Sequence, residues 1–133
     1  MNELIESIKQ HEGFKGKVYI DSEGYETIGY GTKLPITKEE AELLLRHRLN
    51  NMMQELKDNK PFFTSLDPEA QEILFEMAYN LGVSGLLKFT NMWKALEEED
   101  YIEASKEMVN SKWYHQVGIR AKHLVNKMKG VSK

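Results

Sequence analysis

The sequence predicts an α+β fold, mostly helical, with a small β-hairpin lobe, a long connecting helix and a helical lobe. Three observations lead to this fold class. One short segment alternates apolar and polar residues with a period of two, which is typical of strands. A long amphipathic pattern follows it, and every later apolar pattern has helical spacing. The length of 133 residues suits one domain, so we expect a single domain over residues 1–133.

Composition excludes several classes of protein. Hydrophobic residues make up 41% and charged residues 29% of the chain, which is typical of a globular domain and not of a disordered one. Cysteine is absent, which excludes a disulfide framework and thiolate chemistry. The net charge of −3 predicts no general affinity for nucleic acid. No apolar stretch approaches the ~20 residues of a membrane span, and the acidic start is unlike a signal peptide.

A short helix is expected at the beginning of the chain. Its apolar residues have helical spacing from Leu4 to Ile8, and Gly13 ends the pattern. We expect the helix to span residues 3–12, with Asn2 as its N-cap. Because a small hairpin cannot bury its apolar face, we expect this helix to pack on the helical lobe.

A β-hairpin is expected within residues 13–36. Two alternating segments, 17–21 and 25–30, flank a loop at residues 22–24. Three loop residues, with Gly24 in the left-handed conformation, fix the register of the two strands. In that register the even-numbered apolar residues share one face, which is expected to be buried: Val18, Ile20, Ile28 and Tyr30.

The other face of the hairpin carries polar side chains. Asp21 opposes Tyr25 in this register, and Tyr19 opposes Thr27. Asp21 and Thr27 are therefore diagonal neighbours on one face, about 7–8 Å apart at Cα.

The remaining chain reads as helices. Thr37 and Glu40 form a capping box at the start of the connecting helix, which is expected over about 38–57. The helical lobe is expected over about 61–133 and begins with a helix that Asp67 caps. Shorter helices are expected to begin at four further residues and near a fifth: Ser84, Thr90, Asp100, Ser111 and Gly118.

Two carboxyl groups stand out as candidates for chemistry. Glu12 is expected at the C-terminal end of the first helix, where the helix dipole disfavours an ionised carboxylate. Asp21 lies on the polar hairpin face beside Thr27. One protonated and one ionised carboxyl group are what glycoside hydrolysis requires. Because the chain has 21 acidic residues, most of them surface groups, this pair alone is a weak signal.

A longer string of residues resembles a known family. His11-Glu12-Gly13, Tyr19-Ile20-Asp21 and Thr27-Ile28-Gly29-Tyr30-Gly31 follow the signature E-G…Y-x-D-x-x-G-x-x-T-I-G-x-G of phage-type lysozymes, the endolysins of glycoside hydrolase family twenty-four. The resemblance continues in order through Asn80-Leu81-Gly82 and Ser111-Lys112-Trp113-Tyr114, over nearly the whole chain. It implies a lysozyme-like fold and hydrolysis of the β-1,4 bond between N-acetylmuramic acid and N-acetylglucosamine in bacterial peptidoglycan.

The resemblance also implies roles for individual residues. Glu12 matches the general acid, and Asp21 matches the second catalytic carboxylate, which with Thr27 holds the attacking water. Arg120 matches an arginine that orients the acid. Such enzymes usually invert the anomeric carbon. Three further residues match positions near the substrate, although structural roles are open for each of them: Gly29, Gly31 and Tyr79.

No cofactor or metal is expected, because the histidines lack metal-ligand spacing. The expected partner is peptidoglycan, with no nucleic acid, no stable membrane insertion and a monomeric state. The resemblance implies accumulation in the host bacterial cytoplasm and release to the wall by a holin after membrane permeabilisation. Two alternatives stay open, a lytic transglycosylase and an inactive lysozyme-like module that binds the wall.

Overall fold

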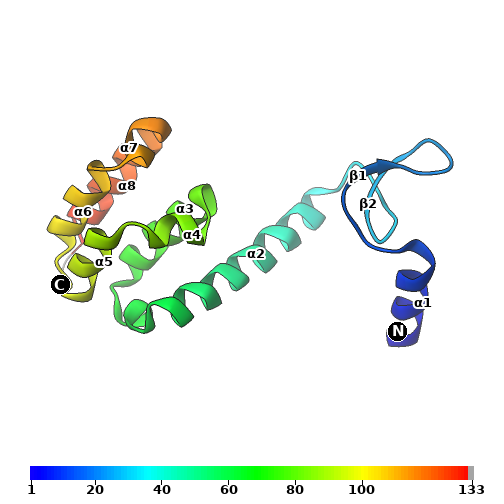
Figure 1. The fold of residues 1–133 in the computed structure, drawn as a ribbon, viewed down its shortest axis with the longest axis horizontal. Helices are drawn as coiled ribbons and strands as arrows, with labels where there is room; N and C mark the ends of the chain where they lie inside the picture. The colour runs from blue at the N-terminus through cyan, green and yellow to red at the C-terminus, as the bar shows by residue number, and fades with distance from the viewer. Residues whose placement is uncertain (132–133) are drawn as a thin grey trace. The chain divides into compact units, whose positions relative to one another are not determined.

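The computed structural model describes residues 1–131, so Ser132 and Lys133 of the predicted helical lobe lie outside the described residues. The predicted α+β, mostly helical fold is confirmed. The chain divides into two compact units, Met1–Leu45 and Arg46–Lys133. Helix α2 (Lys38–Asn59), the long cyan-to-green helix of Figure 1, runs through the boundary between them. The packing of the first helix on the helical lobe stays a prediction.

The first unit begins with helix α1 (Asn2–Glu12), which ends at the predicted residue. The predicted N-cap is wrong, because the amide of Ile5 bonds the carbonyl of Met1 and the helix begins one residue earlier. Gly13 ends the helix as predicted, with a φ of 69°. Glu12 is therefore the last residue of α1.

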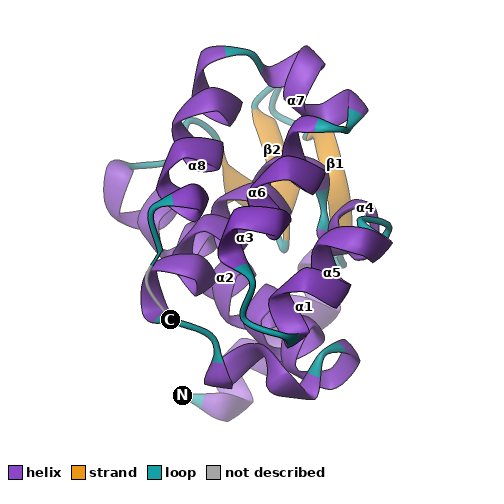
Figure 2. Ribbon diagram, turned by 90° about the vertical axis from the view of Figure 1, so that its left-hand side faces the viewer, coloured by secondary structure: helices purple, strands orange, loops and turns teal. Residues whose placement is uncertain are grey.

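Three strands follow α1 and form an antiparallel sheet in the order β1-β2-β3: β1 (Lys15–Ile20), β2 (Glu26–Gly29) and β3 (Thr32–Lys33). The orange ribbons of Figure 2 show β1 and β2 side by side. The predicted register is confirmed where Tyr19 pairs with Thr27, and Gly24 has the predicted positive φ, 90°. Strand β3 was not predicted. It pairs Lys33 with Thr27 across the sheet.

The predicted burial of one hairpin face is wrong. Val18 and Ile20 are 51% and 62% exposed, whereas Thr27 on the opposite face is the one buried side chain of the first unit. The reason is the location of the apolar core. Every buried apolar side chain among the described residues lies between Leu56 and Val131, so the first unit has no apolar layer to cover that face.

The capping box of the long helix is confirmed. The Thr37 amide donates to the Glu40 carboxylate at 2.9 Å, and the Glu40 amide donates to the Thr37 hydroxyl at 3.1 Å. Helix α2 (Lys38–Asn59) ends two residues later than predicted, just before the proline that opens a 3-10 turn, Pro61–Ser65. That turn was not predicted.

The second unit is helical, as predicted. Its α-helices after α2 are α3 (Pro68–Leu81), α4 (Val83–Leu87), α5 (Thr90–Glu97), α6 (Tyr101–Val109), α7 (Lys112–Val117) and α8 (Ile119–Lys129). The predicted cap at Asp67 is confirmed, and the side chains of Asp100 and Ser111 likewise each accept a backbone amide of the first turn of their helices. Trp93 and Trp113 are 2% and 4% exposed core residues. No helix within residues 1–131 is long and apolar enough to cross a membrane.

Candidate active site

Glu12 is held where the end of α1 meets the loop between β2 and β3. Its carboxyl group lies against the backbone of Gly31, because a Cβ atom added to Gly31 would come within 2.7 Å of Glu12 Cδ and Oε2. Gly31 also has a φ of 77°, which favours glycine. Gly31 thus makes room for the Glu12 side chain, and its predicted place near the substrate stays a prediction.

Gly31→Ala is expected to displace the Glu12 carboxyl group and to lower kcat by about 100-fold, since a misplacement of ~1 Å costs that much. Gly118→Ala is the matched control. It has a similar φ, 75°, and open space around its added Cβ, so it bears the backbone strain without the collision. Activity against purified cell walls checks the prediction, which fails if both variants lose activity equally.

Asp21 follows β1 and organises the hairpin turn with its carboxylate. Oδ1 accepts the backbone amides of Glu23 and Tyr25, at 2.9 and 2.8 Å. The backbone amide of Asp21 donates to the Tyr25 carbonyl at 2.9 Å, in agreement with the predicted opposition of these two residues. The carboxylate is therefore fixed by the local fold of the turn.

Lys33 supplies a third donor to Asp21. Its Nζ lies 2.9 Å from Oδ2, and it also lies 5.1 Å from the centre of the Tyr25 ring. Lys33 was not among the predicted site residues, because it follows the last alternating segment, 25–30, and belongs to no motif. Extending the register beyond a tight turn at Gly29–Gly31 would have placed Lys33 opposite Thr27, on the face that carries Asp21.

These contacts set the charge of Asp21. The Tyr25 amide and then the Lys33 ammonium hold the pKa of the Asp21 carboxyl below its ordinary value of 3.8. The hydrogen bond to Asp21 in turn raises the pKa of Lys33, and the carboxylates of Glu23 and Glu12 raise it further. Asp21 is thus ionised and Lys33 protonated at neutral pH, which suits a carboxylate that acts as a base.

Thr27 shares a face with Asp21, as predicted, but its side chain is 1% exposed. Its hydroxyl group donates to the Tyr25 carbonyl at 2.9 Å, so its oxygen has lone pairs left to accept a hydrogen bond from water. A water molecule can reach this oxygen only if the side chains that cover it move.

The other predicted site residues are Gly29 in the first unit and Tyr79 and Arg120 in the second. Gly29 has a φ of 70° and open space where a Cβ would be. Tyr79, on α3, is 51% exposed, so the alternative of core packing is wrong for it. Arg120 lies 3.5 Å from Glu76 within the second unit. Its predicted contact with Glu12 would join the two units and stays a prediction.

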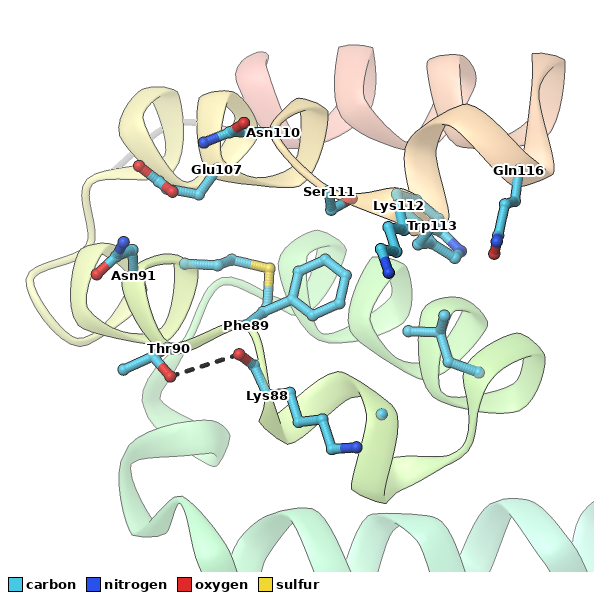
Figure 3. A pocket seen from close by; sticks show the side chains of 13 residues that line it. Lys88, Phe89, Thr90, Asn91, Glu107, Asn110, Ser111, Lys112, Trp113 and Gln116 are labelled. Carbon is cyan, nitrogen blue, oxygen red and sulfur yellow. Dashed lines mark hydrogen bonds between the residues drawn. The ribbon is translucent and has the colours of Figure 1, made fainter.

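The second unit contains a cavity of about 760 Å³, which sequence analysis did not predict. Residues of the α4–α5 segment form one wall and residues of the α6–α7 segment form the other (Figure 3). Trp113 lines it, and the buried indole Nε1 has no hydrogen-bond partner among the described residues. The lining is otherwise mixed, with Lys88, Asn91 and Glu107 among the polar residues. No group of residues within the described part of the chain could hold a metal ion.

Comparison with known proteins places the chain in a family. The sequence profile described as phage lysozyme matches residues 9–130. The chain belongs to the phage lysozyme family. The match includes the three candidate catalytic residues Glu12, Asp21 and Thr27. Family membership makes the chain a glycosidase of the lysozyme type, for which the implied substrate is peptidoglycan.

Two relatives illustrate how this phage lysozyme compares with known proteins. Probable T4-type lysozyme 1 of Dictyostelium discoideum is 27% identical over 158 residues, which cover 95% of the chain and 93% of that protein. The pre-baseplate central spike protein Gp5 of Enterobacteria phage T4 is 31% identical over 149 residues. That match covers 89% of the chain and 26% of Gp5, so the lysozyme-like part is a minor portion of the longer protein.

Proposed function

We propose that the protein is an endolysin that hydrolyses the β-1,4 bond between N-acetylmuramic acid and N-acetylglucosamine, with Glu12 as general acid and Asp21 and Thr27 as the residues that activate and position water. The observation that carries the proposal is the state of Asp21. Three donors fix its carboxylate and lower its pKa, while the carboxyl group of Glu12 lies beside Gly31 at the end of α1. Two carboxyl groups in different surroundings are the basis of glycosidase catalysis.

The proposed reaction needs no covalent intermediate. Glu12 gives its proton to the glycosidic oxygen as the bond to the anomeric carbon breaks. Asp21 takes a proton from the attacking water, whose oxygen forms the new bond on the opposite face of the sugar ring. The configuration is therefore inverted, which requires carboxyl groups ~6.5–9.5 Å apart with room for water between them. Arg120 is proposed to orient Glu12, and Gly29 and Tyr79 to contact the sugar chain.

Thr27→Val is expected to lower kcat by about 100-fold, because the water loses one of the groups that orient it. The loss of stability is expected to be small, about 1 kcal/mol, since the Tyr25 carbonyl keeps the Asp21 amide as a donor. Thr27→Ser, which restores the hydroxyl group, is the control. Equal rates for wild type and Thr27→Val would remove Thr27 from the mechanism.

The biological setting follows as part of the same proposal. The enzyme would act as a monomer, accumulate in the host bacterial cytoplasm and reach the wall through a holin after the membrane is permeabilised. Host lysis would result from cleavage of the wall. Expression in bacteria with and without a co-expressed holin tests this, and lysis that is independent of the holin would contradict it.

Digestion of purified peptidoglycan tests the proposed reaction. Hydrolysis yields products with a reducing N-acetylmuramic acid end, and NMR during digestion is expected to show the inverted anomer first. A lytic transglycosylase would instead release an anhydro product, lighter by one water in mass spectrometry. Binding to walls without release of any reducing sugar would identify an inactive module. Either of these two results would overturn the proposal.

A further inference from the structure

We propose that Lys33 is a positioning residue for Asp21. By its contact with the Asp21 carboxylate, Lys33 directs the attacking water to a single oxygen, Oδ2. This inference rests on the proposed function, because it assumes that Asp21 activates water. All the residues involved belong to the first unit: Asp21, Lys33, Tyr25 and Thr27.

The hydrogen bonds of Asp21 leave one oxygen available. A carboxylate has about four acceptor positions, two on each oxygen. On Asp21, Oδ1 accepts two backbone amides, from Glu23 and Tyr25, which use both of its positions. Among residues 1–131, Lys33 is the one donor to Oδ2, which leaves one of its two positions free. Water that gives a proton to Asp21 must therefore bind Oδ2, beside the Lys33 ammonium.

Lys33 is itself held in place by the sheet. The β2–β3 register puts it directly opposite Thr27, on the face that also carries Asp21. Its ammonium lies over the Tyr25 ring at 5.1 Å, and a cation over an aromatic face is attracted to it. Tyr25 thus contacts both members of the pair, through its amide to Asp21 and its ring to Lys33. The side chain of Lys33 is still 56% exposed, so a substitution leaves no buried gap.

The charge of Lys33 has a direct consequence for catalysis. Three carboxylates act on the charge of Lys33 on β3, those of Asp21, of Glu23 in the turn and of Glu12 at the end of α1. Through its hydrogen bond and its charge, Lys33 helps to keep Asp21 ionised in acid. It also favours loss of the proton that Asp21 has taken from water, which returns the base to its active form for the next cycle.

Lys33→Met tests the proposal, because methionine keeps much of the side-chain length and removes the charge. Lys33→Arg is the rescue variant. Lys17→Met is the matched control, with the same change in net charge on exposed β1. All three are compared with wild type by kcat/KM on peptidoglycan across pH, and the Asp21 carboxyl carbon is titrated by NMR.

The expected results differ between the variants. Lys33→Met loses up to about 100-fold in kcat/KM, as a misplaced catalytic group does. The acidic limb of its pH profile moves to higher pH, since Asp21 is protonated sooner without the cation. Lys33→Arg is expected to return the acidic limb to its wild-type position. Lys17→Met is expected to leave that position unchanged.

Two results would overturn the inference. One is a pH profile of Lys33→Met that superimposes on that of wild type, and the other is an equal change in Lys17→Met. The NMR titration needs no activity, so it separates the two proposals. An unchanged Asp21 titration in Lys33→Met disproves the role of Lys33, whereas inactive wild-type protein disproves the proposed function.

Discussion

Glu12→Gln is expected to abolish clearing of bacterial walls, with a fall in kcat of about 10²–10⁴-fold, the usual contribution of a general acid. Glutamine keeps the size of the side chain and its contact with Gly31 but has no proton to give to the glycosidic oxygen. The fold is expected to persist, because a carboxylate at the C-terminal end of a helix meets the negative end of the helix dipole and adds no stability there.

Glu3→Gln is the control for Glu12→Gln, since Glu3 lies in the first turn of the same helix and its substitution removes the same charge. A turbidity assay on walls, with circular dichroism to verify folding, checks the result. If Glu12→Gln and Glu3→Gln clear walls at the same rate, Glu12 is not the general acid.

Local patterns in the sequence predicted most of the fold, because they depend on neighbouring residues. The Thr37–Glu40 capping box and the Asp67 cap are set by three or four successive residues, and both occur as predicted. The pairing of Tyr19 with Thr27 is fixed by loop length and by Gly24. The 3-10 turn at Pro61–Ser65 and the two-residue strand β3 escaped prediction because segments this short have no periodicity.

Burial was harder to predict than secondary structure. Alternation put Val18 and Ile20 on a common face, but alternation does not say which face of a sheet is covered. In the structure the covered side chain is Thr27, a polar residue with an internal hydrogen bond to the Tyr25 carbonyl. The sequence pattern therefore predicted the pairing of Tyr19 with Thr27 correctly and the environment of Val18 and Ile20 wrongly.

The candidate catalytic residues were predicted from the sequence, but the cation that pairs with Asp21 was not. Glu12, Asp21 and Thr27 were identified by their order in a long motif. Lys33 belongs to no motif, and its importance depends on a turn that brings β3 back beside β2. The role of Gly31 likewise depends on a distance, the close approach of Glu12, that spacing along the chain does not encode.

Asp21→Asn is expected to reduce kcat by about 10²–10⁴-fold, because an amide cannot take a proton from water. Asparagine can keep the hairpin turn, since its side-chain carbonyl accepts the amides of Glu23 and Tyr25 as the Oδ1 atom does now. Its amide group cannot accept a hydrogen bond from Lys33, so the ion pair is lost. Asp58→Asn, which removes an exposed carboxylate from α2, is the charge-matched control.

The pH dependence of stability distinguishes this role of Asp21 from a structural one. Because the folded pKa of Asp21 is lowered, its contribution to the free energy of unfolding is present above the ordinary value of 3.8 and is lost as the pH falls through the lowered pKa. The stability difference between wild type and Asp21→Asn should therefore narrow in acid, while activity stays low at every pH. A variant that is cooperatively folded and fully active would show that Asp21 is not the base. One that does not fold at neutral pH would show that Asp21 mainly supports the hairpin turn.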